Sequence, residues 1–438
     1  MHCFAGRISF TKLIQPGEKE PLPRLLFYND CLIMNAPNIL LLVCFFPIMV
    51  WAKADSISFT NFSVTTEFQL QESGLYKHIG SSLEVQFSPR LVVKTVLATS
   101  AADMSALVPE AIAITDLFLL TKTRYFLIAF ARQDQAFAAL KKLQTLPSVL
   151  LVQPDLQQKR TAAGPAVTFS ANSSASAMEL PVYLHRAQQK SLWPGNGGAG
   201  VRVAVIDDGF MLQHPELAHL HTSIYYDFAA RQLIPTNSAK KTGASAKHGT
   251  KVLGILFGEH NQHEPEGLVP NATFVGISQL DTWTSNTLQG FYIAYLAKAD
   301  VINCSWHSEW LMEPVQDVVD ELSRYGREGK GTAVVFAAGN QHKLITPGMH
   351  EASIASAMVV GASNANGDPL AFSNYGTSID IWAYGQKTLS TDENGGYSYF
   401  LGSSLSSVIV SGYIALLISA DQSLNLTQIQ HKLTQLVE

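Results

Sequence analysis

The sequence predicts an α/β protein in which a small α+β domain precedes a larger domain built on a mostly parallel sheet. Two observations support this prediction. After Gly200, apolar runs rich in valine and isoleucine alternate with helical segments, which is typical of a buried parallel sheet. Upstream, residues 83–155 show shorter strand and helix patterns in the order β-α-β-β-α-β. Parallel sheets collect functional groups where their strands end at the carboxyl edge.

Residue patterns define each element of the upstream unit. In chain order they are a strand over Leu83–Phe87, a helix over Ser100–Val108, strands over Ile112–Leu120 and Arg124–Phe130, a helix over Asp134–Leu146 and a strand over Val149–Asp155. The second helix has apolar residues at Phe137, Leu140 and Leu143 after a capping Asp134. The order is ferredoxin-like, although order alone leaves other small α/β domains open.

The larger domain is indicated by apolar runs that follow one another after Gly200. They read "VRVAVID", "GTKVLGILFG", "ATFVGIS", "ADVINCSW", "TAVVFAAGN" and "SAMVVGAS". The small, polar residues before them, 157–180, lack periodicity and contain a dibasic Lys159-Arg160 step, so we expect a flexible linker there. The predicted domains are therefore residues 55–156 and 181–438.

Residues 1–54 have the features of a leader. The apolar run Ile39–Trp51 is too short for a membrane span of about 20 residues, but it suits a signal peptide. Ala52-Lys53-Ala54 follows it as an A-x-A cleavage site. The long stretch before this run is unusual, and Met34 is a candidate for the true start. A buried core helix and an uncleaved anchor are the alternatives.

Composition excludes one class of partner and one source of stability. The formal charge is −5 without a basic stripe, so we expect no nucleic-acid partner. Three of the four cysteines lie at or before the apolar run, which leaves Cys304 alone in the mature chain and no internal disulfide. Core packing must then supply the stability.

Four side chains at predicted strand or helix ends could act together. Asp207 ends an apolar strand, His248 begins an apolar helix, Asn340 follows a third run, and Ser404 lies in the serine-rich "GSSLSSVIVSG". Each alone has a simpler interpretation as a turn residue or a helix cap. Together they meet the needs of nucleophilic catalysis, in which an imidazole deprotonates a hydroxyl, a carboxylate orients the imidazole and an amide holds the oxyanion.

The chain from about residue 178 onwards resembles the subtilisin-like serine peptidases, the subtilases. The motifs that carry this resemblance are "VRVAVIDDGFMLQHPEL", "HGTKVLG", "VPNATFVGI", "ADVINCSW", "AVVFAAGN", "AFSNYG" and "GSSLSSVIVSG". The resemblance implies a three-layer α/β domain and a catalytic set of Asp207, His248 and Ser404. It also implies that Asn340 and the Ser404 backbone N–H form the oxyanion hole.

The resemblance also implies a substrate groove, and here the sequence departs from the family. The groove residues are Ser305, Trp306, His307, Ala338 and Gly339. The segment "SWHSEW" replaces the family's Ser-Leu-Gly-Gly, so larger side chains are expected to reshape the groove.

Three smaller departures leave the catalytic set intact. Lys251 replaces a second histidine, Ser406 an alanine and Val408 a proline.

Residues 83–155 resemble the inhibitory propeptide of subtilases. This implies a zymogen whose own N-terminal domain occupies the cleft and is removed by self-cleavage within 156–180. We expect a secreted or periplasmic monomer that acts on polypeptides and, once mature, contacts no membrane. Calcium occurs in the family, but no ligand set is assigned and no cofactor is expected.

The alternatives are a pseudoprotease, a nucleotide-binding domain and a metal site. The altered groove could mark a pseudoprotease that binds peptides without cutting them, although the complete catalytic set favours an enzyme. A nucleotide-binding domain is excluded because no glycine-rich phosphate loop follows the first strand. His260 and His263 lie among glutamates without an HExxH frame, which indicates a polar loop rather than a metal site.

Overall fold

The computed structural model describes residues 25–28, 31–36, 39–44, 56–162, 181–189, 191–192, 195–234, 246–261 and 266–437. Strands β1 (Leu25–Tyr28), β2 (Cys31–Ala36) and β3 (Ile39–Cys44) form an antiparallel sheet in a unit of their own, Met1–Ala52. The predicted signal run overlaps β3, and its remaining residues lie outside the described ranges. The leader and its cleavage site therefore stay predictions.

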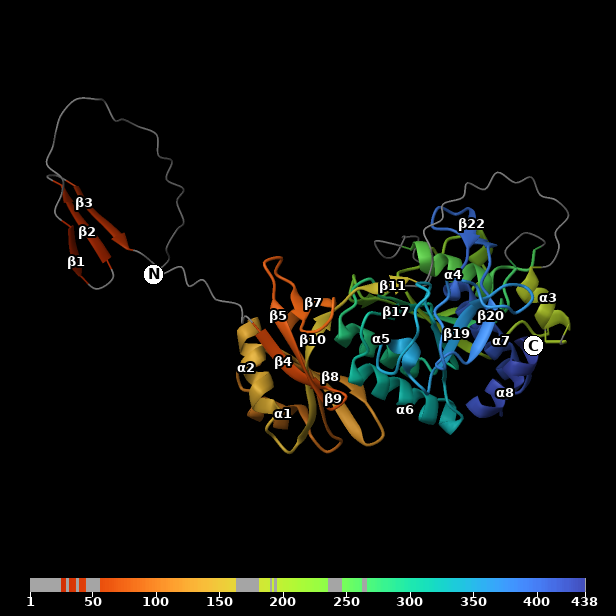
Figure 1. The fold of residues 1–438 in the computed structure, drawn as a ribbon, viewed down its shortest axis with the longest axis horizontal. Helices are drawn as coiled ribbons and strands as arrows, with labels where there is room; N and C mark the ends of the chain where they lie inside the picture. The colour runs from red at the N-terminus through yellow and green to blue at the C-terminus, as the bar shows by residue number, and fades with distance from the viewer. Residues whose placement is uncertain are drawn as a thin grey trace, which may run out of the picture. The chain divides into compact units, whose positions relative to one another are not determined.

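The N-terminal domain contains the predicted β-α-β-β-α-β order. Its elements are β7 (Glu84–Val96), α1 (Ala101–Leu107), β8 (Ala113–Leu119), β9 (Thr123–Ala129), α2 (Gln133–Leu143) and β10 (Val149–Gln157). The strands pair antiparallel in the spatial order β10-β7-β9-β8, as in a ferredoxin-like sheet. Helices α1 and α2 cover one face of this sheet (Figure 1).

Three strands that were not predicted from the sequence precede this unit. They are β4 (Ser56–Asn61), β5 (Val64–Leu70) and β6 (Tyr76–His78), which extend the sheet antiparallel from the start of β7. Their buried aromatic side chains, Phe59, Phe68 and Tyr76, cluster with Phe87 of β7. In the sequence, alternating polar and apolar residues along β4 are a signal for such a strand.

The larger domain is built on an eight-stranded sheet in the order β14-β13-β15-β12-β16-β18-β19-β20. All neighbours pair parallel except β14 with β13, which agrees with the predicted mostly parallel sheet. The strands are β12 (Arg202–Asp207), β13 (Thr222–Asp227), β14 (Gln232–Leu233), β15 (Thr273–Ser278), β16 (Val301–Cys304), β18 (Ala333–Ala337), β19 (Met358–Ser363) and β20 (Ile381–Tyr384). Two smaller pairings lie outside it, β11 (Arg160–Ala162) with β17 (Trp306–Ser308) and β21 (Thr388–Thr391) with β22 (Tyr397–Phe400).

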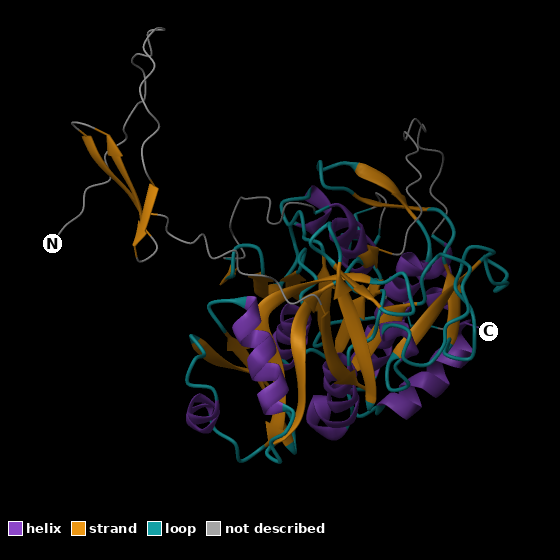
Figure 2. Cartoon of the chain, turned by 60° about the vertical axis from the view of Figure 1, so that its left-hand side comes forward, coloured by secondary structure: helices purple, strands orange, loops and turns teal. Residues whose placement is uncertain are grey.

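Helices cover both faces of this sheet and complete the three layers. Helices α5 (Thr284–Leu296) and α6 (Glu313–Gly329) lie on one face, and α4 (Lys247–Phe257) and α7 (Ser403–Ala420) on the other (Figures 1 and 2). Helices α3 (Val182–Gln189) and α8 (Leu426–Val437) pack beside α7, and short 3-10 turns cover Pro215–Leu217 and Glu351–Ser353. Within the described residues α7 alone is long and apolar enough to cross a membrane, but nearly all its side chains are buried, as in a core helix.

The helix pair α5–α6 lies between the two sheets. The N-terminal sheet contacts α5 through β8 and β10, and one apolar cluster runs from that sheet through this layer to the parallel sheet. A second cluster occupies the α4–α7 face. The two domains therefore share a core on one side of the parallel sheet, and this contact stabilises their association.

Polar side chains of the N-terminal domain satisfy the N-termini of both shared helices. Asp155 Oδ1 accepts from the Ser285 backbone N–H at 2.8 Å, and Asp155 forms an ion pair with Arg90 at 2.7 Å. At α6, Asn61 Oδ1 accepts from the Glu313 N–H at 2.9 Å. A helix leaves its first N–H groups without partners, so each contact offsets a cost of burial. Burial raises the pKa of Asp155, against the opposing effects of Arg90 and Ser285.

We expect Asp155→Ala to destabilise the protein by about 1–3 kcal/mol, because it leaves the buried Ser285 N–H and the partly exposed Arg90 without this acceptor. Calorimetric melting in a Ser404→Ala background, where the expected self-cleavage cannot occur, measures the effect. Asp134→Ala is the control, since Asp134 pairs with Arg132 at 2.9 Å in an exposed position. Equal melting temperatures for the two variants would contradict the role assigned to Asp155.

Candidate active site

Three of the predicted residues meet at the carboxyl edge of the parallel sheet. Asp207 is the last residue of β12, His248 lies in the first turn of α4, and Ser404 begins α7. His248 Nδ1 is 2.9 Å from Asp207 Oδ1, and His248 Nε2 is 3.0 Å from Ser404 Oγ. Both carboxylate and hydroxyl are buried. This geometry allows the imidazole to receive a proton from Ser404 while Asp207 orients the ring.

Asp208 positions the helix that carries His248, a role that sequence reasoning missed. Its carboxylate accepts from the backbone N–H of His248 at 3.2 Å and of Gly249 at 2.9 Å. An acidic side chain at a helix N-terminus satisfies unpaired N–H groups and complements the helix dipole. Gly249 is required here, because a Cβ at this position would lie 2.3 Å from the Gly209 carbonyl oxygen.

Asn340 is held against the start of α7. Its Oδ1 accepts from the Ser403 N–H at 2.9 Å, and Ser403 Oγ accepts from the Gly339 N–H at 3.0 Å. Because Oδ1 is engaged, the NH₂ group is the donor end of this amide. Helix α7 begins after Gly402, whose φ of 92° is unfavourable for other residues. The simpler interpretation of Ser403 or Ser404 as the N-cap is wrong, since Gly402 occupies that position without a side-chain cap.

The imidazole of His248 has a raised pKa. Burial favours the neutral ring, but the negative charge of Asp207 and its hydrogen bond outweigh burial, with a smaller contribution from Asp208. The pKa therefore lies above its ordinary value of 6.5. The neutral form that can accept a proton predominates only above the raised pKa.

The end of the N-terminal domain enters the cleft beside these residues. Strand β11 pairs antiparallel with β17, so that Arg160 is opposite Ser308 and Ala162 is opposite Trp306. Just before it, Gln158 exchanges two 2.8 Å hydrogen bonds with the backbone of Trp310. The predicted flexible linker thus begins with an ordered segment; its remaining residues, 163–180, lie outside the described ranges.

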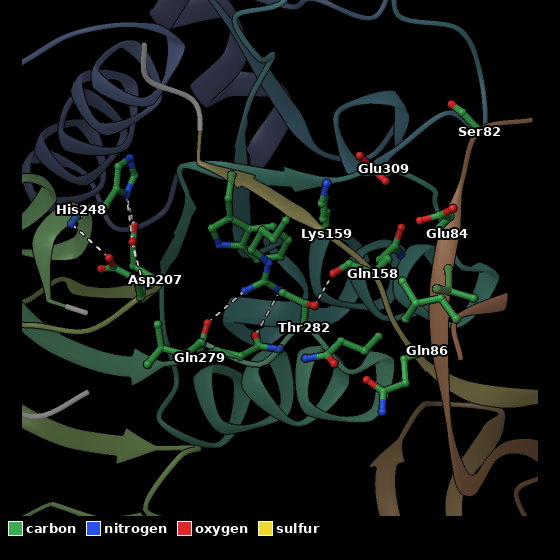
Figure 3. Close-up of a pocket in the computed structure, with 17 residues that line it drawn as sticks. Ser82, Glu84, Gln86, Gln158, Lys159, Asp207, His248, Gln279, Thr282 and Glu309 are labelled. Atoms are coloured by element: carbon green, nitrogen blue, oxygen red, sulfur yellow. Dashed lines mark hydrogen bonds and ion pairs between the residues drawn. The ribbon is translucent and has the colours of Figure 1, made fainter. Parts of the chain in front are cut away.

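A cleft of about 560 Å³ follows this segment between the two domains. Figure 3 shows Asp207 and His248 at one end, and Glu84 and Gln86 from β7 at the other. The cleft therefore joins the candidate catalytic residues to a surface supplied by the N-terminal domain.

Two of the predicted groove residues, Trp306 and His307, have buried side chains. Trp306 is buried and its Nε1 donates to the Ile206 carbonyl at 2.7 Å. His307 stacks on His350 with ring centroids 4.2 Å apart, and a Cβ on Gly339 would lie 2.7 Å from His307 Nε2. Burial, aided by His307, lowers the pKa of His350 to about 3. Trp306 and His307 are adjacent in β17 and therefore pack on opposite faces of the strand, while its backbone pairs with β11.

Buried hydrogen bonds connect the groove strand to the rest of the domain. Glu351 accepts from the Ser308 N–H at 2.7 Å and from its Oγ at 2.6 Å. Ser305 Oγ donates to the Ser404 carbonyl at 3.2 Å, and Ser404 Oγ lies 3.0 Å from the Ser305 carbonyl, which accepts from it. Ala338 is buried and follows the last residue of β18, directly before Gly339.

The smaller departures from the family pattern are accommodated. Lys251 Nζ donates to the Tyr399 carbonyl at 3.0 Å, and Ser406 Oγ donates to the Ala383 carbonyl at 3.0 Å. Val408 is buried inside α7.

Cys304 is a buried core residue, and burial raises the pKa of its thiol well above the ordinary value.

No metal-binding group is assigned. Within the described ranges there is no cluster of three or more histidine, cysteine, aspartate or glutamate side chains suited to a metal ion. His260 Nε2 lies 2.7 Å from the Gly267 carbonyl, and His263 lies outside the described residues.

Comparison with known proteins supports the resemblance. The model of the subtilase family matches residues 198–436. A thermophilic serine proteinase from Bacillus sp. (strain AK1) is 32% identical over 244 residues, which is 55% of this chain and 57% of that protein. Subtilisin-like protease 2 of Plasmodium falciparum is 30% identical over 236 residues, 51% of this chain and 17% of that protein. The chain thus spans little more than half of the first relative and a sixth of the second.

Among solved structures, fervidolysin from Fervidobacterium pennivorans, described as a keratinolytic enzyme related to subtilisin, is similar in fold. The TM-score is 0.61 at 19% identity, over 80% of this chain and 57% of that one. This coverage exceeds the family match over residues 198–436, so the likeness of fold extends into the N-terminal domain.

We expect the pKa of His248 to fall in Asp207→Asn. The asparagine retains an acceptor for Nδ1 but removes the negative charge, so burial then dominates and favours the neutral ring. NMR titration of the imidazole in a Ser404→Ala chain measures this pKa. A parental pKa at or below 6.5, or no decrease in the variant, would contradict the electrostatic role of Asp207.

We also expect Asp208→Ala to destabilise the chain by about 0.5–2 kcal/mol, whereas Asp208→Asn retains most of the stability. The alanine leaves the His248 and Gly249 N–H groups without this acceptor, while asparagine still offers one. Thermal melting compares both variants with the parent. If asparagine destabilises as much as alanine, capping is not what Asp208 contributes.

Proposed function

The chain belongs to the subtilase family, and we propose that it is a serine endopeptidase made as a self-processing zymogen. The observation that carries this proposal is the line from Asp207 to His248 to Ser404, with contacts of 2.9 and 3.0 Å. An isolated serine is a poor nucleophile, and this arrangement supplies the base and the orienting carboxylate that it needs.

In the proposed reaction Ser404 Oγ attacks the substrate carbonyl carbon while His248 Nε2 takes the hydroxyl proton. The negative charge that forms on the carbonyl oxygen is stabilised by the Asn340 amide NH₂ and by the Ser404 backbone N–H at the start of α7. His248 then protonates the leaving amine, which departs with the C-terminal part of the substrate. Water, deprotonated by His248, hydrolyses the acyl-enzyme in the same way and restores Ser404.

The N-terminal domain acts as an intramolecular inhibitor in this proposal. Support comes from β11, which pairs with β17 as an added strand, a mode in which backbone contacts supply the affinity. The helix caps by Asp155 and Asn61 hold the same domain on α5 and α6. Processing is proposed within residues 156–180, and export as a secreted or periplasmic monomer follows from the predicted leader and from the family.

A fluorophosphonate probe tests the activity, because it labels a serine only when a base activates it. We expect the processed parent protein to be labelled at Ser404 and to show a new N-terminus within residues 156–180 by mass spectrometry. Ser404→Ala and His248→Ala should lose both signals, since loss of either group lowers turnover by about six powers of ten in subtilisin.

Asn340→Ala provides a graded control for the oxyanion role. Loss of one such donor lowers kcat by about 10²–10³-fold, a figure that comes from subtilisin. The variant should therefore process slowly while remaining folded. Labelling that persists in Ser404→Ala would refute the assignment of the nucleophile. A folded parent that is neither labelled nor processed would favour the alternative, a pseudoprotease that binds peptides.

A further inference from the structure

One basic side chain of the N-terminal segment lies half-buried in the cleft, whereas its neighbour is exposed. Arg160 lies over the Trp306 ring, with its guanidinium carbon 3.4 Å from the ring centroid. Lys159, the other half of the dibasic step, is exposed. Arg160 Nε is buried and has no hydrogen-bond partner within the described part of the chain. The segment that contains β11 therefore places one specific basic side chain, Arg160, in this site.

The wall opposite Trp306 consists of neutral oxygen acceptors. Arg160 Nη2 donates to Gln279 Oε1 at 3.3 Å and to Thr287 Oγ1 at 3.2 Å, and Nη1 donates to the Gln279 carbonyl at 3.5 Å. Figure 3 marks the contacts at Gln279 with dashed lines. A planar guanidinium can stack on an indole and donate from its edge at the same time, which an ammonium or an aliphatic side chain cannot do.

The charge of Arg160 is retained in this site. Burial lowers its pKa to about 10, while the surrounding Glu351, Asp207 and Asp281 favour the charged form. The group is thus a cation at neutral pH. An aliphatic side chain in its place would leave the buried Gln279 oxygen without this donor, which disfavours such a substrate.

The strand register defines where this site lies relative to the reacting serine. Arg160 is opposite Ser308 and Ala162 is opposite Trp306. The next groove residue, Ser305, has its carbonyl 3.0 Å from Ser404 Oγ. A substrate residue that follows the position of Ala162 is therefore adjacent to the nucleophile, and the bond after that residue is cleaved. Arginine then occupies the fourth position before the cleaved bond.

We propose that Trp306, Gln279 and Thr287 form an arginine subsite that selects substrates with arginine at the fourth position before the cleaved bond. This inference rests on the proposed peptidase function and specifies its substrate class. Applied to the chain itself, the sequence Arg160-Thr161-Ala162-Ala163 is cut before Gly164. The arginine of the dibasic step then serves for recognition. Cleavage directly after the dibasic step would instead leave Thr161 at the new N-terminus.

The first test needs no catalysis. In a Ser404→Ala full-length chain, hydrogen exchange of the β11 and β17 amides is compared between Arg160→Ala and Lys159→Ala. The arginine variant loses the stacking and the three hydrogen bonds, so we expect about tenfold faster exchange or more. The exposed lysine is the matched control and should leave exchange unchanged. Equal exchange in the two variants would overturn the subsite.

The second test uses the processed protein and peptides of the form acetyl-X-Thr-Ala-Ala-aminomethylcoumarin, with X as arginine, lysine, citrulline or leucine. We expect kcat/KM for arginine to exceed that for leucine by about 10–100-fold, with citrulline and lysine between them. Citrulline preserves the planar shape but removes the charge. Equal rates for arginine and leucine would overturn the proposal.

Variants of Thr287 test the same subsite from the enzyme side. Thr287→Val removes the acceptor hydroxyl at constant size and should reduce the arginine-to-leucine ratio several-fold, whereas Thr287→Ser should retain it. An unchanged ratio in the valine variant contradicts the role of Thr287.

If no peptide is cut but the exchange test succeeds, the peptidase function fails and the arginine site stands. If peptides are cut without preference, only the subsite fails.

Discussion

The parallel pairing of β12 with β15 and β16 is the constraint on which the rest of the structure depends. It places Asp207 opposite Ser278, at the edge where β16 continues into Ser305. Because all these strands run the same way, helices that begin at this edge bring their first residues together. In this way His248 comes into contact with Asp207, and Ser404 with His248. The buried carboxylate is stable there because it also accepts from the Asp208 N–H at 2.8 Å.

The pair α5–α6 joins the N-terminal domain to the parallel sheet. One face of the pair covers the parallel sheet, and the N-terminal domain covers the rest and satisfies the helix N-termini. Exposed N-termini would be hydrated, but buried ones need protein acceptors, so apolar contact and capping reinforce each other. Helix α5 also carries Thr287, which contacts Arg160. Helix α5 thus contacts both the sheet of the N-terminal domain and the segment that follows it.

Strong periodicity made most of the fold predictable from the sequence. The buried parallel strands, the ferredoxin-like unit and the positions of Asp207, His248 and Ser404 follow from local patterns and from the resemblance. The strands β4–β6 were overlooked because their inward side chains alternate with polar ones over short runs, and only pairing with β7 makes them a sheet. Asp208 was overlooked because a cap depends on the neighbouring α4. Trp306 was predicted as a groove residue, but residue type alone does not give the direction of its side chain.

In the proposed zymogen, the segment that contains β11 has to meet two opposing requirements, because it must occupy the groove firmly and yet be cut and released. Its affinity is spread over the strand pairing, the Gln158–Trp310 exchange and the Arg160 site, and each contact is modest. While the chain is intact these contacts form within one molecule and benefit from a high effective concentration. In this proposal cleavage removes that advantage from the segment, whereas the apolar interface and the helix caps remain in place. Release of the N-terminal domain would then depend on the surface around α5 and α6, and recognition of the cleaved bond on the groove, so that the two properties could change independently.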